Sequence, residues 1–158
     1  MTEPHVSSTI SSDAAPAGAA PRMLLAGLPS DTHTWNLVYL ELRYAERGYR
    51  VRNLGCCVPA GELLEAAGEA RPDVVVLSTV NGHGRVEAVP LALELRRDPR
   101  LAGVPIVVGG KLTIDGRLSA EAQQELLAAG FDAVFSGEDA LTEFDRFLEA
   151  RGIARAGG

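Results

Sequence analysis

Short apolar runs alternate with amphipathic stretches along most of the chain, from residue 22 to residue 150. A short apolar run bounded by turn residues predicts a buried strand, and apolar residues at every third or fourth position predict a helix. The runs that fit the strand pattern are Met23–Leu28, Tyr49–Leu54, Asp73–Ser78, Val104–Val108 and Phe131–Phe135. The stretches that fit the helix pattern are Thr34–Arg47, Pro59–Ala70, Val86–Arg97, Ser119–Ala129 and Glu138–Ala150.

The first predicted helix has an apolar face and a defined end. Trp35, Val38, Leu42 and Ala45 recur at helical spacing. We expect this face, with Trp35, to pack against the core. Gly48 follows where a glycine commonly ends a helix.

This alternation predicts an α/β fold with a parallel sheet and right-handed crossovers. We expect a flavodoxin-like (Rossmann-like) doubly wound five-stranded parallel sheet with strand order 2-1-3-4-5. In such sheets, ligands bind beyond the carboxyl ends of the strands, where the strand order reverses. Three loops with unusual residues fall there: Ser30–His33, Ser78–Gly84 and Gly109–Lys111. Function should therefore reside in these loops.

Composition narrows the class of protein. The 158 residues suffice for one domain. We expect a disordered Ser-, Ala- and Pro-rich tail over 1–21, the folded domain over 22–150 and a flexible C-terminal tail over 151–158. The net charge of −6 disfavours nucleic acid as a partner. The lack of a long apolar run or a secretory leader predicts a cytoplasmic protein without a membrane span.

The first polar loop places Asp31 two residues before His33. A carboxylate that accepts from one imidazole nitrogen fixes the tautomer and leaves the other nitrogen as a base or metal ligand. Such a triplet also arises when an Asp or Thr caps a helix beside a solvent-exposed histidine. Spacing alone does not separate these interpretations, but the position at a strand end favours the first.

Three segments together resemble a known family. Asp31-Thr32-His33-Thr34-Trp35-Asn36, Ser78-Thr79-Val80 and Gly109-Gly110 are similar to the D-x-H-x-x-G, S-x-L and G-G motifs of the cobalamin-binding domain. Adenosylcobalamin-dependent mutases and methionine synthase share that domain. The resemblance covers residues 22–150, and its nearest likeness is to the small subunits of glutamate mutases.

The resemblance implies roles for particular residues. His33 would be the lower axial ligand of cobalt, in place of the cofactor's own dimethylbenzimidazole, and Asp31 would hydrogen-bond the other nitrogen of His33. Ser78 would contact the nucleotide tail in a channel between sheet and helix, where Gly109 and Gly110 allow close approach. The remaining cofactor-binding residues would be Ser30, Thr32, Thr34, Asn36, Val80 and Gly82.

Two positions depart from the family pattern. Val80 replaces a leucine, which is a mild change. Asn36 stands where the pattern has glycine. Asparagine tolerates a left-handed backbone better than most residues, so a backbone role would survive, whereas close approach of the cofactor would not.

The resemblance implies a cobalamin-carrying small subunit of a carbon-skeleton mutase, with adenosylcobalamin as cofactor. The chain would be active only with a large TIM-barrel subunit that holds an amino-acid substrate, by default glutamate. The alternatives are a corrinoid carrier for methyl transfer, which usually has an additional N-terminal helical bundle, and a non-enzymatic cobalamin-binding module. A response-regulator receiver is disfavoured, because the third strand ends in Ser78 and not in a phospho-accepting aspartate.

Four further residues have simpler interpretations. Cys56 and Cys57 are adjacent, a spacing that suits neither a disulfide framework nor a metal site, and we expect both to be small buried hydrophobes. His83 is either a contact to the corrin ring or an ordinary loop histidine. Lys111 is expected to be solvated.

Overall fold

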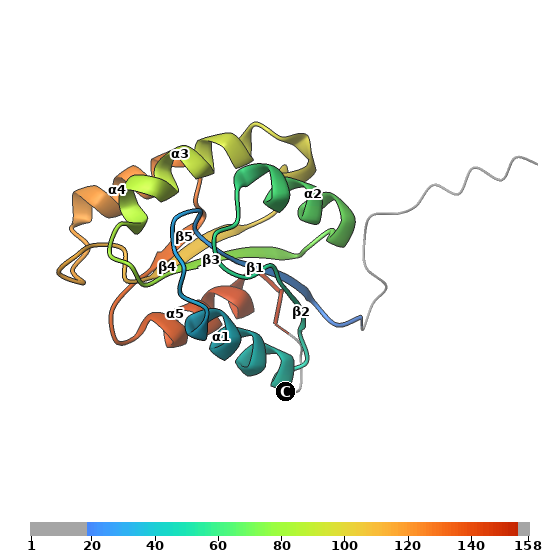
Figure 1. Ribbon diagram of the computed structural model, residues 1–158. Coiled ribbons are helices and arrows are strands. Elements are labelled where there is room, and N and C mark those ends of the chain that lie inside the picture. Colours follow the sequence, from blue (N-terminus) through green and yellow to red (C-terminus); the bar gives the residue numbers. More distant parts are fainter. Residues whose placement is uncertain (1–18, 155–158) are drawn as a thin grey trace, which may run out of the picture.

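The predicted strands form a single parallel sheet in the computed structural model, which describes residues 19–154 (Figure 1). The strands are β1 (Arg22–Gly27), β2 (Arg50–Asn53), β3 (Val74–Thr79), β4 (Ile106–Gly110) and β5 (Ala133–Phe135). Their order in the sheet is β2-β1-β3-β4-β5, and every neighbouring pair is parallel. The predicted fold class and strand order are therefore confirmed.

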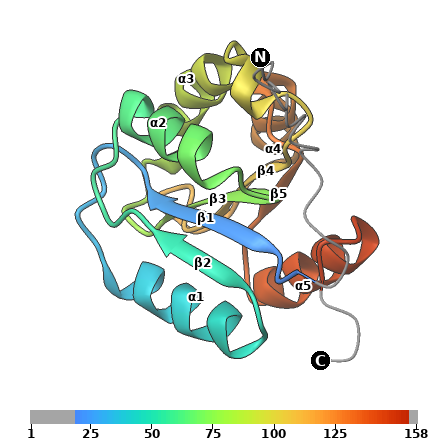
Figure 2. The same ribbon diagram turned by 90° about the vertical axis from the view of Figure 1, so that its right-hand side faces the viewer.

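Helices cover both faces of the sheet. They are α1 (Trp35–Glu46), α2 (Ala60–Ala70), α3 (Gly84–Arg96), α4 (Ala120–Ala129) and α5 (Ala140–Ala150), with a short 3-10 helix η1 at Pro99–Leu101. Figures 1 and 2 show α2, α3 and α4 on one face and α1 and α5 on the other. All five predicted helices are present, and no end differs from its predicted position by more than two residues.

The core consists of two apolar layers that share the central strands. All six residues of β3 are buried, and successive side chains point to opposite faces. Val75 and Leu77 pack with the layer under α2, α3 and α4. Val74 and Val76 pack with the layer under α1 and α5. This two-sided burial explains why β3 is a continuous apolar run.

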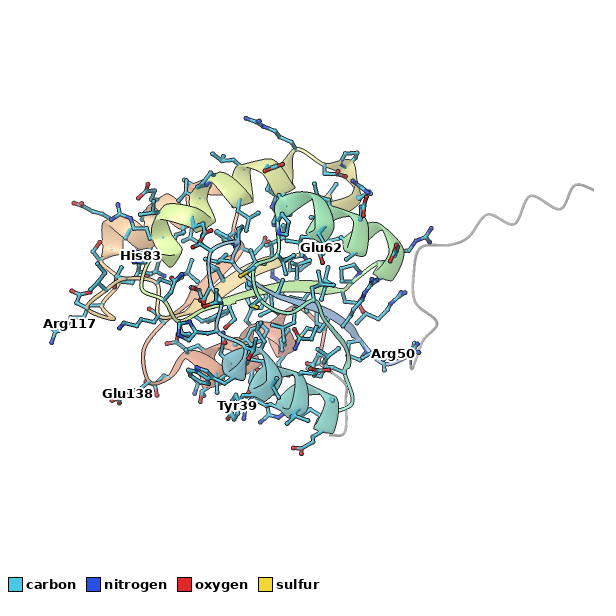
Figure 3. All side chains as sticks on the ribbon, in the orientation of Figure 1. Tyr39, Arg50, Glu62, His83, Arg117 and Glu138 are labelled. Atoms are coloured by element: carbon cyan, nitrogen blue, oxygen red, sulfur yellow. The ribbon has the colours of Figure 1, made fainter. Side chains whose placement is uncertain are left out.

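The prediction for the apolar face of α1 was wrong. Trp35 is 65% exposed, and Val38 and Leu42 are also exposed. The helix instead packs through Leu37 and Tyr44, which are almost fully buried. Tyr39, labelled in Figure 3, likewise lies on the outer side of α1.

Arg96 joins the elements at the amino ends of β4 and β5. Its guanidinium donates to the carbonyl oxygens of Gly130 at 2.8 Å, Val104 at 2.9 Å and Leu101 at 3.2 Å, and it pairs with the carboxylate of Asp132. Asp132 also accepts from the backbone N–H of Ile106 at 2.8 Å. This cluster ties α3, β4 and β5 at the edge of the sheet opposite the three polar loops.

Parts of both predicted tails lie outside the described residues, namely 1–18 and 155–158. Within the described part, the carbonyl oxygen of Pro21 accepts from Arg50 N at 2.8 Å. At the other end, Ile153 and Ala154 pack against the α1–α5 layer of the core. The chain therefore stays packed beyond residue 150, through Ala154.

Replacing Gly110 with alanine tests how closely β3 and β4 fit together. Gly110 has a φ of +105°, and an added Cβ would lie 2.1 Å from the carbonyl oxygen of Thr79. Gly103 has a φ of +75°, but a Cβ there would meet nothing within 4 Å. We expect Gly103→Ala to lower the free energy of unfolding by about 1–2 kcal/mol through backbone conformation alone. Gly110→Ala should lower it at least about twice as much, because the strands must also move apart.

Urea unfolding followed by circular dichroism measures both variants against the unsubstituted chain. Equal losses in the two variants would contradict the close fit of Gly110 against Thr79.

Candidate functional site

The loops after β1, β3 and β4 come together at the carboxyl edge of the sheet, on the left in Figure 1. Ser30 begins the first loop and is held by Glu87 in the first turn of α3. Both Ser30 N and Ser30 Oγ donate to the Glu87 carboxylate at 2.7 Å. We call this edge, with its three loops, the rim.

Asp31 is the central residue of the rim. Its side chain is only 1% exposed, yet four donors surround its carboxylate. Oδ1 accepts from His33 N at 3.0 Å and lies 2.7 Å from His33 Nδ1. Oδ2 accepts from Thr79 Oγ1 at 2.6 Å and from Val80 N at 2.8 Å. The carboxylate therefore joins the end of β1 to the end of β3.

These contacts keep Asp31 ionised. Burial alone would raise the pKa of Asp31, but the hydrogen bonds from Thr79, His33 and Val80 outweigh it and lower the pKa from 3.8 to about 2. An ionised carboxylate only accepts hydrogen bonds, so the nitrogen of His33 that faces it carries the proton.

His33 is thereby oriented for coordination. Its Nδ1 is occupied by Asp31, which leaves the lone pair of Nε2 for another partner in the neutral ring. The side chain is 46% exposed, so a ligand arriving at the rim can reach it. A carboxylate behind a histidine is the usual way in which proteins orient metal-binding imidazoles.

The alternative interpretation, a helix cap beside a free histidine, does not fit this geometry. Thr34 is the N-cap of α1, and it makes no side-chain capping bond. The Asp31 carboxylate points to the end of β3 instead. Within the described residues, no group of three or more His, Cys, Asp and Glu side chains could hold a metal ion.

Asn36 and Ser78 form a second polar pair, deeper than His33. Asn36 is 6% exposed, and its Nδ2 donates to Ser78 Oγ at 2.8 Å. The other amide atom of Asn36, Oδ1, is buried and has no hydrogen-bond partner. An unpaired buried acceptor costs about 1–3 kcal/mol, so this atom requires an explanation.

A cavity of about 250 Å³ lies between the sheet and helices α1 and α5, beside this pair. Five predicted cofactor-binding residues line it: Asn36, Ser78, Val80, Gly109 and Gly110. Apolar side chains from the sheet and from both helices form most of the remaining wall, including Leu40, Val76, Val107, Phe135 and Phe144. The cavity is therefore apolar apart from the Asn36–Ser78 pair.

The expectation of a left-handed backbone role for Asn36 was wrong. Asn36 lies in the first turn of α1, and it is not among the described residues with a positive φ. A left-handed backbone therefore does not explain the asparagine. A Cβ on Gly110 would clash with the carbonyl oxygen of Thr79. A Cβ on Gly109 would lie 3.1 Å from the carbonyl oxygen of Phe135. The fit between neighbouring strands restricts both positions, and both glycines also line the cavity, so the close approach of the nucleotide tail stays a prediction.

The other predicted residues lie at the rim in different environments. Thr32 and Thr34 are exposed. Gly82 is buried and has a φ of +80°. His83 is exposed, its N–H donates to Asn81 Oδ1 at 2.9 Å, and it lies on the loop before α3 in Figure 3. Lys111 is exposed.

The expectation that both cysteines are buried was wrong for Cys57. Cys56 is partly buried against the α1–α5 layer of the core, but Cys57 is exposed and has a φ of +53°. Its N–H donates to the Asp31 carbonyl at 3.1 Å, and its Sγ lies 3.4 Å from the same oxygen. Cys57 therefore supports the backbone of the Asp31 loop.

Sequence reasoning missed three residues that hold the rim together. Thr79 donates to Asp31, Glu87 binds Ser30, and Asn81 Oδ1 lies 3.2 Å from Thr79 Oγ1 and accepts from His83 N. Thr79 and Asn81 stand within the predicted Ser78–Gly84 loop, so the position of that loop was a usable signal. No local pattern marks Glu87, which is one acidic residue in a predicted helix.

No helix in the described part of the chain is long and apolar enough to cross a membrane.

Several curated proteins are similar to this chain. The HTH-type transcriptional repressor CarA of Myxococcus xanthus is 39% identical over 95 residues, which are 60% of this chain and 32% of CarA. The glutamate mutase sigma subunit of Carboxydothermus hydrogenoformans is 31% identical over 113 residues, 72% of this chain and 82% of that subunit. The sigma subunit of Halobacterium salinarum is 30% identical over 132 residues, 82% of this chain and 84% of that subunit. This chain thus spans about a third of CarA and most of the sigma subunits.

Solved structures share the fold. A cobalamin-binding protein from Desulfitobacterium hafniense superposes with a TM-score of 0.62 at 18% identity, over 81% of this chain and 58% of that one. The chemotaxis response regulator CheY4 of Vibrio cholerae also gives 0.62 at 18% identity, over 84% of this chain and 98% of that one. At such identities the likeness concerns the architecture alone, because this fold hosts unrelated functions.

The model of one family matches nearly the whole folded part of the chain. It is the B12 binding domain, and it matches residues 21–145. That range contains the rim, the cavity and both polar pairs. This chain belongs to the B12 binding domain family.

Proposed function

We propose that this chain is the cobalamin-carrying small subunit of an adenosylcobalamin-dependent carbon-skeleton mutase similar to glutamate mutase. One observation carries the proposal: the ionised, buried Asp31 holds Nδ1 of the half-exposed His33 at 2.7 Å and leaves Nε2 free at the rim. His33 would bind cobalt from below, in place of the cofactor's dimethylbenzimidazole.

The described residues fit such a cofactor at two depths. His33 stands at the rim, where a flat macrocycle can rest on the loops, and the apolar cavity lies below, between sheet and helices. Its volume of about 250 Å³ is below the roughly 300–1,000 Å³ of pockets that enclose a whole drug-sized ligand. The cavity therefore suits one end of a larger molecule, the displaced nucleotide tail. Adenosylcobalamin, when bound, supplies a cobalt–carbon bond that breaks homolytically and starts hydrogen abstraction from substrate.

Exposed apolar side chains surround the rim and support a partner. Trp35 begins α1, Val86 lies in the first turn of α3, and Ile114 lies on the loop after β4. All three are at least 65% exposed, and exposed apolar groups that cluster commonly mark an interaction surface. We propose that a large TIM-barrel subunit covers this edge, shields the cofactor from water and holds the amino-acid substrate.

The substrate assignment rests on similarity to the sigma subunits, which align over more than four-fifths of their own length. The cavity lining contains no cationic side chain, so it does not offer an amino acid's carboxylates an ion pair. We therefore assign substrate binding to the partner, with glutamate as the first substrate to test.

A second candidate function is regulatory. The 39% identity to the transcriptional repressor CarA exceeds that to the sigma subunits and favours a cobalamin-binding module that controls another protein. The same Asp31–His33 pair would serve it, because ligation does not require turnover.

Ligation is tested by electron paramagnetic resonance of the complex with cob(II)alamin. We expect hyperfine coupling to one imidazole nitrogen that changes when the protein carries ¹⁵N-labelled histidine, and that is absent in His33→Ala. His83→Ala is the matched control, since His83 is another exposed rim histidine, and it should keep the coupling. Coupling that persists in His33→Ala and still changes with ¹⁵N-labelled histidine would refute the ligand assignment.

The ionisation of Asp31 gives a pH-dependent prediction. Since the pKa of Asp31 is lowered from 3.8 to about 2, its charge contributes stability that is complete above about pH 4 and is lost as the pH falls toward 2. Thr79→Val removes one donor to this carboxylate. We expect it to lower the free energy of unfolding by about 1–2 kcal/mol at pH 7, and this deficit to shrink at about pH 2, where Asp31 takes up a proton.

Urea unfolding at the two pH values measures this deficit. Thr142→Val, on the exposed side of α5, is the control and should change neither value. A deficit of equal size at both pH values would mean that Thr79 acts through packing and not through the charge of Asp31.

Turnover distinguishes the candidate functions. We expect no isomerisation of glutamate by this chain with adenosylcobalamin alone, and isomerisation once a glutamate mutase large subunit is added. Activity of the isolated chain would overturn the assignment of substrate binding to the partner. Methyl transfer instead would indicate a corrinoid carrier, and cobalamin-dependent control of a DNA-binding partner would favour the regulatory function.

A further inference from the structure

The unpaired carbonyl of Asn36 belongs to a residue that lines the apolar cavity. Asn36 is more than nine-tenths buried, and its Oδ1 has no hydrogen-bond partner. Buried side-chain oxygens nearly always have a partner. An exception beside a cavity indicates that the partner arrives with the molecule that fills the cavity.

The neighbouring Ser78 supplies the complementary group. Its Oγ accepts from Asn36 Nδ2 at 2.8 Å, and a hydroxyl that accepts one bond still has its own proton to donate. The pair therefore presents one acceptor, the Asn36 carbonyl, and one donor, the Ser78 hydroxyl. The rest of the wall is largely apolar, with Val76, Val107 and Phe135 from the sheet and Phe144 from α5.

We propose that Asn36 selects the base of the cofactor's nucleotide tail, and that it favours a base with an exocyclic amino group, such as adenine, over dimethylbenzimidazole. This inference rests on the proposed function, since it requires a cobamide whose base is displaced from cobalt into the cavity.

The chemistry of the two bases differs at one group. Both are flat, suit apolar walls and have a ring nitrogen that can accept from Ser78. Dimethylbenzimidazole has no N–H donor once it is attached to its sugar, so the Asn36 carbonyl would stay unpaired beside it. Adenine has an amino group that can donate to this carbonyl, as adenine commonly does to asparagine side chains.

Competition between two cobamides tests the proposal. The protein is mixed with equal, excess amounts of the dimethylbenzimidazole and adenine cobamides in the cob(II) state. The bound fraction is recovered by gel filtration, and its composition is measured by chromatography. Because the free cobamides can differ in how readily their base leaves cobalt, the informative quantity is the preference of the unsubstituted protein divided by that of a variant.

Asn36→Gly and Asn36→Leu are the informative variants. The first removes the side chain, and the second keeps a similar volume without the carbonyl. We expect the preference for the adenine cobamide to fall about tenfold in both, which corresponds to one hydrogen bond. Ser78→Ala should weaken binding of both cobamides by a similar factor and leave the preference nearly unchanged.

The outcomes separate this inference from the proposed function. If neither cobamide binds, or if bound cobalt shows no coupling to His33, both fail. If both bind through His33 with a preference that Asn36→Gly and Asn36→Leu leave unchanged, only the role of Asn36 fails. An increased preference for the adenine cobamide in Asn36→Leu would also overturn the role of Asn36. It would mean that the amide donates from Nδ2 to a ring nitrogen of dimethylbenzimidazole.

Discussion

A single buried carboxylate determines the arrangement of the rim. Asp31 lies on the loop after β1, and its carboxylate contacts the end of β3, where Thr79 and the following Val80 donate to it. This contact is possible because the strand order makes β1 and β3 neighbours. A buried charge is tolerated only when hydrogen bonds replace the water that it has lost. The four contacts to Asp31 do this, and one of them fixes the imidazole of His33.

The rim and the cavity are linked through the beginning of α1. His33 precedes the helix by two residues, and Asn36 lies in its first turn, so one short segment supplies both the exposed imidazole and the buried amide. The imidazole is fixed to β3 through Asp31, and the amide is fixed to β3 through Ser78. A shift of this segment would therefore move both groups together.

The strands and the location of the site could be predicted from sequence, but the side chains that complete the site could not. Apolar runs such as Val74–Leu77 are buried on both faces and have a single interpretation. Helix α1 has apolar residues on two sides, and helical spacing does not say whether Leu37 or Trp35 faces the sheet. In the structure Leu37 is buried and Trp35 is exposed. Glu87 contributes through a contact with Ser30, which is distant in sequence and which no local pattern reveals. The predicted loop after β3 contains Thr79, but its contact with Asp31 is equally distant in sequence.

The contacts of Arg96 stabilise the fold at a place distant from the candidate site. They tie α3, β4 and β5 through three backbone carbonyls and Asp132 at the edge away from the rim. Every residue has a backbone carbonyl, so most of the contacts of Arg96 do not depend on which side chains its partners carry. The rim loops can thus differ in sequence without loss of these contacts. Such freedom is consistent with one architecture serving a chemotaxis regulator and cobalamin proteins alike.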